Sequence, residues 1–242
     1  MKTNAQKILL WLYPPSVGKI RWVSVTDLKT LVPALTESGQ RSLLLYLQRK
    51  RSLELNGDRA RITDLGMTLL RAEFDIFSRV EDWNRSWSII CFLKAPASDP
   101  SFRYLRKLLL ASGAGQLTRA VYLYPGKLKA KVGDTLLTLY QENVLVLESD
   151  KWLFGDERIV ANQLFALKDQ QSALSGISRE VDQLLSLKKR GKISIGQLKI
   201  KIFTVFDRLL PILGNDLGIA EYYYDDGLSS LSLLSLLKEL LD

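Results

Sequence analysis

The sequence predicts a mixed α+β protein, and three observations lead to that class. Apolar residues at helical spacing recur through both ends of the 242-residue chain. Short alternating runs flank an Asn-Gly pair at residues 56–57, as in a β-hairpin. Strand-like and helix-like runs then alternate along the middle of the chain. We expect three parts, which are residues 1–78, a central domain over 79–156 and a mainly helical domain over 157–242.

Three helices and a hairpin are expected in the first part. Apolar residues from Asn4 to Tyr13 have helical spacing and end at two prolines. Ser24 is a candidate N-cap for a second helix, because an acidic residue follows three positions later. A break over 36–39 precedes a third helix over 40–51. The hairpin over 53–63 follows it, and helical spacing resumes from Thr63 to Phe74.

This order is that of a winged helix-turn-helix, whose third helix reads DNA. If Leu43, Leu44 and Leu47 face the core, the opposite stripe of this helix can reach base edges in a major groove. We expect four residues to read bases: Gln40, Arg41, Leu45 and Gln48. Four more are expected to hold phosphates: Lys50, Arg51, Arg59 and Arg61. The alternative interpretation is a set of solvated charges on a small helical domain.

The charge distribution favours the nucleic-acid interpretation. Residues 1–72 hold 12 Lys and Arg against 5 Asp and Glu, a net charge of +7, and the remaining residues carry +1. A basic module joined to a nearly neutral body suggests a polyanionic partner. A generally basic protein without such a partner would spread its charge evenly.

The absence of histidine excludes several kinds of catalytic site. Ser-His-Asp and Cys-His catalysis and zinc sites with His ligands all need a residue that this chain lacks. The lone Cys91 cannot form an intramolecular disulfide. Together with the lack of an apolar run long enough to span a bilayer, it predicts a cytoplasmic protein without a membrane segment. We expect no catalytic residue, no metal and no cofactor.

The central region is expected to form a ferredoxin-like sandwich. Strands are predicted over 87–93, 115–124 and 144–147, with helices over 99–112 and 128–140. The C-terminal region is predicted to be helical, with a long helix over 159–187 interrupted near Gly176 and further helices over 200–213 and 228–241. The basic run over 188–192 closes the long helix, where cations are favourable.

Three stretches together resemble the PaaX family, the repressors of phenylacetate catabolism. They are GQRSLLLYLQRKRSLELNGDRARITDLG (39–66), DWNRSWSIICF (82–92) and GAGQLTRAVYLYP (113–125). The resemblance implies a winged helix-turn-helix, a central domain related to small ferredoxin-like CRISPR-associated nucleases, and a helical C-terminal domain. It also implies a dimer that represses transcription until an acyl-CoA-type effector, an aryl-CoA thioester, binds.

The resemblance also raises the question of nuclease activity. The related nucleases place a metal-binding Asp after the first central strand, where this chain has Leu93 or Lys94. Glu148 and Asp150 share one side of a strand, but such a pair is usually solvated. We therefore expect a non-enzymatic regulator, a repressor that reads an inverted repeat in double-stranded DNA as a homodimer. The alternatives are a divergent metal-dependent nuclease and a CRISPR-linked DNA-binding adaptor.

Overall fold

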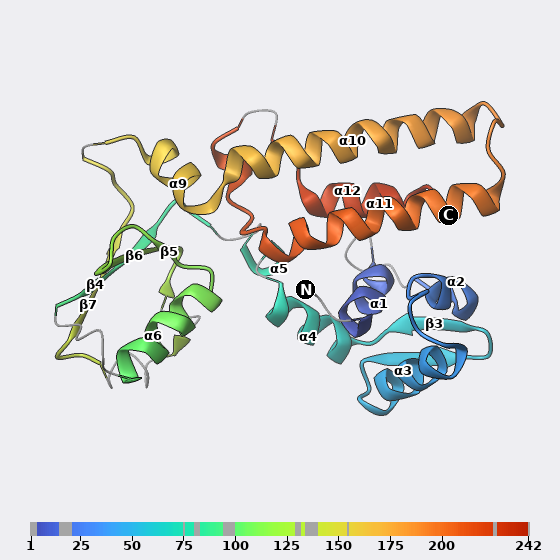
Figure 1. Cartoon of the computed structure of the whole chain (residues 1–242), viewed down its shortest axis with the longest axis horizontal. Helices are drawn as coiled ribbons and strands as arrows, with labels where there is room; N and C mark the ends of the chain where they lie inside the picture. The colour runs from blue at the N-terminus through green and yellow to red at the C-terminus, as the bar shows by residue number, and fades with distance from the viewer. Residues whose placement is uncertain are drawn as a thin grey trace. The chain divides into compact units, whose positions relative to one another are not determined.

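Three helices and a small antiparallel sheet begin the chain in the computed structural model (Figure 1). The helices are α1 (Asn4–Leu12), α2 (Val25–Thr30) and α3 (Glu37–Arg49). The sheet has the order β1-β3-β2, with strands β1 (Val23–Ser24), β2 (Leu53–Asn56) and β3 (Arg59–Ile62). The structure describes residues 4–14, 21–74, 76–79, 83–93, 100–128, 132–133, 140–153, 155–224 and 227–241.

Side-chain caps determine where these helices begin. Ser24 Oγ accepts a hydrogen bond from the Thr26 amide at 3.2 Å, which confirms the predicted N-cap of α2. Thr36 Oγ1 accepts one from the Gly39 amide at 3.2 Å and caps α3. Helix α3 therefore starts at Glu37, and the prediction of a break over residues 36–39 was wrong. These four residues form a cap and a first turn.

The predicted hairpin is confirmed, and so is the helix after it. Strands β2 and β3 pair from Leu53↔Ile62 to Asn56↔Arg59, and Gly57 takes a φ of +59° in the turn. Thr63 caps α4 (Asp64–Glu73). A short helix α5 (Ile76–Arg79) follows α4.

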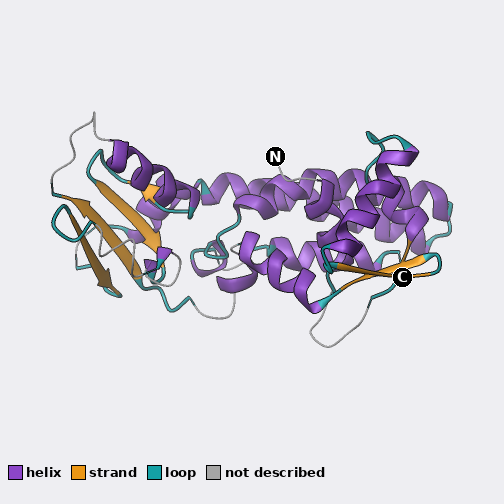
Figure 2. Cartoon of the chain, turned by 90° about the horizontal axis from the view of Figure 1, so that it is seen from below, coloured by secondary structure: helices purple, strands orange, loops and turns teal. Residues whose placement is uncertain are grey.

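A second antiparallel sheet, of order β5-β6-β4-β7, forms the central region (Figure 2). Its strands are β4 (Trp87–Phe92), β5 (Gly115–Gln116), β6 (Val121–Pro125) and β7 (Val144–Ser149). Helix α6 (Pro100–Ala111) packs against one face, where Ile90, Phe92 and Tyr122 enter a shared core with Phe102 and Leu105. The α+β class predicted from the sequence is confirmed.

The single strand predicted over 115–124 was wrong. Thr118 Oγ1 accepts hydrogen bonds from the amides of Ala120 and Val121, and the Leu117 amide donates to the Val121 carbonyl. These bonds turn the chain back, so the segment forms the hairpin β5–β6. Most of the helix predicted over 128–140 lies outside the described residues.

Helices fill the C-terminal region, as predicted. They are α9 (Glu157–Phe165), α10 (Leu167–Lys189), α11 (Ile195–Asn215) and α12 (Ser230–Glu239), with a short 3-10 turn at Ala220–Tyr222. The break predicted at Gly176 was wrong, because α10 continues through that residue. The break falls at Ala166, which has a φ of +50°. No helix in the described part of the chain combines the length and apolar character needed to cross a membrane.

Contacts divide the chain into two units that do not follow the three predicted ranges. Unit 1 comprises Met1–Ser78, Gln171–Gly218 and Asp226–Asp242. Unit 2 comprises Arg79–Gln170 and Ile219–Asp225. Helices α1 to α4 therefore belong to one unit with α11, α12 and most of α10, while α9 belongs to unit 2. The division into 1–78, 79–156 and 157–242 stays a prediction about modules.

Helix α1 joins the two ends of the chain within unit 1. Trp11 is 1% exposed and packs on Phe203 and Phe206 of α11, with ring centroids 5.2 and 5.0 Å away. From α12, the buried Lys238 Nζ donates to the Tyr13 carbonyl at 2.6 Å. The N-terminal helices thus share one hydrophobic core with α11 and α12.

An aromatic cluster stabilises unit 2 around the start of β4. Trp83 and Trp87 meet edge to face at 5.5 Å, and Tyr222 lies 4.8 Å from Trp83. The Trp87 indole and the Tyr223 hydroxyl both donate to Glu157 Oε1 at 2.7 Å. Burial and, secondly, the hydrogen bond to Glu157 raise the pKa of Tyr223 far above its ordinary value. Tyr222 and Tyr223 are therefore part of the packing of unit 2.

Candidate nucleic-acid interface

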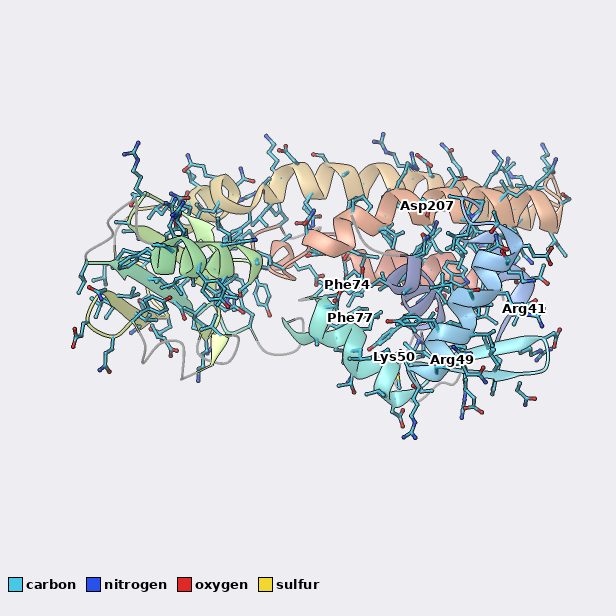
Figure 3. The ribbon with its side chains drawn as sticks, turned by 60° about the horizontal axis from the view of Figure 1, so that its bottom comes forward. Arg41, Arg49, Lys50, Phe74, Phe77 and Asp207 are labelled. Atoms are coloured by element: carbon cyan, nitrogen blue, oxygen red, sulfur yellow. The ribbon has the colours of Figure 1, made fainter. Side chains whose placement is uncertain are left out.

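Helix α3 presents a continuous exposed face opposite its buried leucines. Leu44 and Leu47 are buried in the core of unit 1. The opposite face carries Arg41, Ser42, Leu45, Tyr46, Gln48 and Arg49, all of them exposed. Figure 3 labels Arg41 and Arg49 on this helix and Lys50 at its end. The structure thus brings together three of the four residues predicted to read bases.

The exposed face is wider than the predicted stripe. Ser42, Tyr46 and Arg49 form a second stripe beside Arg41, Leu45 and Gln48, at spacings of three and four residues. Tyr46 is 53% exposed, and the Lys50 ammonium lies 6.0 Å from its ring centroid. The buried stripe of α3 is narrow, because only Leu44 and Leu47 of its 13 residues are buried.

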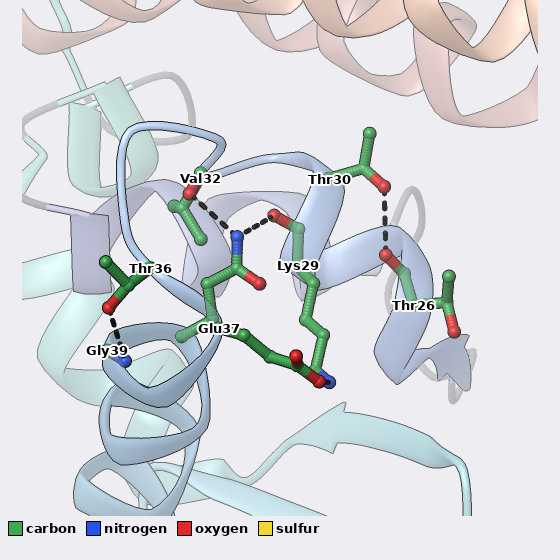
Figure 4. A network of polar contacts seen from close by, with 8 residues as sticks. Thr26, Lys29, Thr30, Val32, Thr36, Glu37 and Gly39 are labelled. Carbon is green, nitrogen blue, oxygen red and sulfur yellow. Dashed lines mark hydrogen bonds and ion pairs between the residues drawn. The ribbon is translucent and has the colours of Figure 1, made fainter.

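Gln40 is turned away from that face. Its Nε2 donates to the carbonyls of Lys29 and Val32, each at 3.2 Å (Figure 4). Both carbonyls lie at the C-terminal end of α2 or just after it, so the Gln40 amide fixes α3 against α2. These two bonds give Gln40 a positioning role, and base reading by Gln40 stays a prediction.

The hairpin offers one free arginine of the two predicted. Arg59 is exposed beside the turn. Arg61 is half-buried and pairs with its cross-strand neighbour Glu54, with Nε and NH2 at 2.7 and 2.6 Å from Glu54 Oε2. The Arg61 guanidinium also lies 5.1 Å from the centroid of the Trp22 ring. Because Glu54 neutralises this charge, Arg61 supports the hairpin, and a phosphate contact by Arg61 stays a prediction.

The segment between α3 and α4 fixes the end of α3. Lys50 and Arg51 are exposed there, and Arg51 takes a φ of +55°. Thr63 Oγ1 donates to the Arg51 carbonyl at 2.5 Å. A Cβ on Gly66 would lie 2.2 Å from the Ser52 carbonyl oxygen. Glycine therefore lets α4 pack closely against the chain that leaves α3.

Positive charge gathers in the unit that contains this surface. Unit 1 holds 21 Lys and Arg against 14 Asp and Glu, a net charge of +7, while unit 2 has a net charge of +1. The arrangement can attract a polyanion and present polar side chains to it.

The acidic residues considered for nuclease chemistry lie in unit 2. Glu148 is near the end of β7 and Asp150 follows that strand, and both are exposed. Leu93 comes directly after β4 and is exposed, whereas Lys94 lies outside the described residues. Among the residues that the structure describes, no three His, Cys, Asp or Glu side chains are grouped so that they could hold a metal.

Comparisons with known proteins assign no family. No protein-family model matches the chain. No curated protein matches it either. Among solved structures, the chain is similar to the uncharacterized protein Rv0674 from Mycobacterium tuberculosis, at 17% sequence identity and a TM-score of 0.49. The similarity covers 99% of this chain and 92% of the other.

Proposed function

We propose that the protein is a non-enzymatic, DNA-binding transcriptional regulator, a repressor whose helix α3 enters the major groove. The observation that carries this proposal is the exposed polar face of α3, followed by a hairpin with an exposed arginine in the basic unit. The order α1-β1-α2-α3-β2-β3 and the sheet order β1-β3-β2 support a winged helix-turn-helix.

The residues divide into two roles within this proposal. Arg41 and Gln48 read base edges, because a guanidinium suits guanine and a carboxamide suits adenine in the major groove. Leu45 gives an apolar contact between them, and Tyr46 borders it. The phosphates are held by Arg49, Lys50, Arg51 and Arg59, which are all exposed.

A homodimer on an inverted repeat is the second part of the proposal. The sheet order β5-β6-β4-β7 is that of a ferredoxin-like sandwich, in support of the predicted central domain. Strand β7 ends this sheet and exposes Leu145 and Leu147, at 42% and 47%. An exposed apolar edge favours a partner, and a second copy would cover it. The resemblance of the three segments to PaaX supports an acyl-CoA-type effector.

Selection from a random library of double-stranded DNA tests this function. We expect the purified protein to enrich an inverted repeat, because two reading helices in a symmetric dimer contact two equivalent half-sites. The same protein is incubated with DNA and Mg²⁺ or Mn²⁺ as a second arm. Absence of any enriched sequence contradicts the proposal, and metal-dependent cleavage would favour the nuclease alternative.

Removing the Arg41 side chain should weaken binding to the enriched sequence selectively. We expect Arg41→Ala to cost about 1–3 kcal/mol on that sequence and much less on random DNA, because a bidentate base contact discriminates between bases. Titration of both duplexes with the variant measures the difference. Lys107→Ala, which removes an exposed cation of unit 2, is the matched control. Equal losses on both duplexes would make Arg41 a phosphate contact.

The two hairpin arginines should differ in their effect on salt dependence. Arg59→Ala is expected to make the fall of log K with log salt less steep by about 0.9 for each protomer bound, since each protomer loses one phosphate contact. The double variant Glu54→Ala/Arg61→Ala removes a neutralised pair and should leave the slope unchanged. Binding titrations over a series of salt concentrations measure both slopes. A drop in slope with the double variant alone would reverse the two assignments.

A further inference from the structure

We propose that the turn between α10 and α11 is a second surface for DNA phosphates, outside the segment that α3 reads. We call Lys189, Arg190 and Lys192 the basic turn. This inference rests on the proposed function and extends it, because it assigns a contact to the C-terminal helices. The partner is the backbone of the same duplex, beyond the bases that α3 contacts.

The local charge around the basic turn is strongly positive. Between Asp182 and Asp207 the chain holds no acidic residue and six cations: Lys188, Lys189, Arg190, Lys192, Lys199 and Lys201. The net charge of residues 73–242 is only +1, because acidic residues outside this stretch balance its six cations. Six cations on the end of α10, the start of α11 and the turn between them are enough to attract a polyanion.

Folding accounts for some of these cations and leaves the basic turn unexplained. Lys188 Nζ donates to the Leu240 carbonyl at 2.8 Å, and Lys199 Nζ pairs with Asp27 at 2.6 Å. The three residues of the basic turn are exposed and form no ion pair with any residue that the structure describes.

The partial charges at the helix ends favour Lys189 but not Lys192. Lys189 lies in the last turn of α10, where a cation is favourable. Lys192, however, lies two residues before Ser194, the N-cap of α11. The start of a helix carries a partial positive charge, so a cation there is unfavourable for the helix and raises the local positive potential. An anionic ligand would relieve this accumulation of charge.

Two contacts place the basic turn at the same end of unit 1 as the hairpin tip. The Lys199–Asp27 pair holds the first turns of α11 to α2. The Val25 amide at the start of α2 donates to the Asp58 carbonyl in the hairpin turn at 2.7 Å. Figure 1 shows the α10–α11 turn, α2 and the tip of the β2–β3 hairpin at this end.

The way a helix-turn-helix binds DNA brings the duplex toward the basic turn. In this motif the helix before the reading helix crosses the DNA backbone, and here that helix is α2. A duplex held by α3 and the hairpin therefore passes α2 and continues toward the end of the unit that carries the basic turn. Double-stranded DNA presents a negative charge about every 1.7 Å along its axis, so phosphates are available wherever the duplex passes.

Binding to two duplexes tests the inference. One duplex is the enriched sequence trimmed to its conserved bases, and the other carries additional flanking pairs on both sides. We expect the fall of log K with log salt to be steeper on the flanked duplex than on the trimmed one by about 2–3 for each protomer bound, because three further cations of each protomer meet phosphates. The triple variant Lys189→Gln/Arg190→Gln/Lys192→Gln should remove this excess and weaken flanked-duplex binding by about tenfold at low salt.

A matched triple variant separates a local contact from general attraction. Lys107→Gln/Arg119→Gln/Lys151→Gln removes the same charge from exposed positions of unit 2 and should retain the excess slope. Circular dichroism melting checks that both triple variants fold. If the basic-turn variant behaves like the control while Arg41→Ala still loses the enriched sequence, this inference is overturned and the proposed function stands. If the wild-type protein binds neither duplex, the proposed function fails as well.

Discussion

Replacing Trp11 by alanine is expected to lower the free energy of unfolding by about 3–5 kcal/mol, since a fully buried tryptophan loses its contacts and leaves a cavity. The indole packs on Phe203 and Phe206, and the Arg21 guanidinium lies 5.2 Å from its ring centroid. All of these partners belong to unit 1, so the variant weakens the joint between α1 and α11. Chemical denaturation followed by circular dichroism measures the loss.

Tyr46→Ala is the matched control for this prediction. It removes an aromatic side chain that is exposed on α3, so its effect on stability should stay within about 0.5 kcal/mol. A loss below about 1 kcal/mol for Trp11→Ala would mean that α1 and α11 do not share a core.

The second large effect is expected at Gly66. Gly66→Ala should destabilise the fold by about 3 kcal/mol, at the upper end of overpacking losses, because the added Cβ would lie 2.2 Å from the Ser52 carbonyl oxygen and 2.8 Å from Ile62 Cγ1. The backbone oxygen cannot rotate away as a flexible side chain would. The strain must therefore move α4 relative to the chain that leaves α3, and DNA binding should fall together with stability.

Gly176→Ala provides a control with the opposite sign. This glycine lies inside α10 with nothing within 4 Å of an added Cβ, so alanine should stabilise the protein by about 0.5–1 kcal/mol through helix propensity. Thermal unfolding of the two variants should therefore shift in opposite directions. Stabilisation by Gly66→Ala would show that the close approach to Ser52 is absent in solution.

Local signals in the sequence predicted the elements that depend on neighbours along the chain. Ser24 caps α2 as expected, and the Asn-Gly pair lies in the hairpin. Two predictions were wrong, each at a short polar segment whose sequence is compatible with two backbone structures. Thr36 caps α3 at a position where the sequence predicted a break between helices. Thr118 turns the chain within residues 115–124, which the alternation of apolar residues predicted to be one strand. In both cases a threonine hydroxyl bonds nearby amides, which spacing alone does not show.

Helical spacing in the sequence predicted which side chains of α3 are exposed, and it predicted no more of the candidate site than that. Arg41, Leu45 and Gln48 lie on the predicted face because the leucines between them are buried. Gln40 and Arg61 have the right side-chain chemistry for DNA, but tertiary partners occupy them. The partners of Gln40 are carbonyls from α2, and the partner of Arg61 comes from the opposite strand. No periodicity along the chain reports such contacts.

The shared core of unit 1 also has a consequence for protein synthesis. Ile8 and Leu237 are both fully buried in that core, although they lie near opposite ends of the chain. At roughly 5–20 residues per second, the ribosome completes α12 about ten seconds or more after α1 has been made. Until α11 and α12 have been made, the apolar side of α1 has no partner from them. A translation product that stops before α11 therefore cannot complete the core beneath α3.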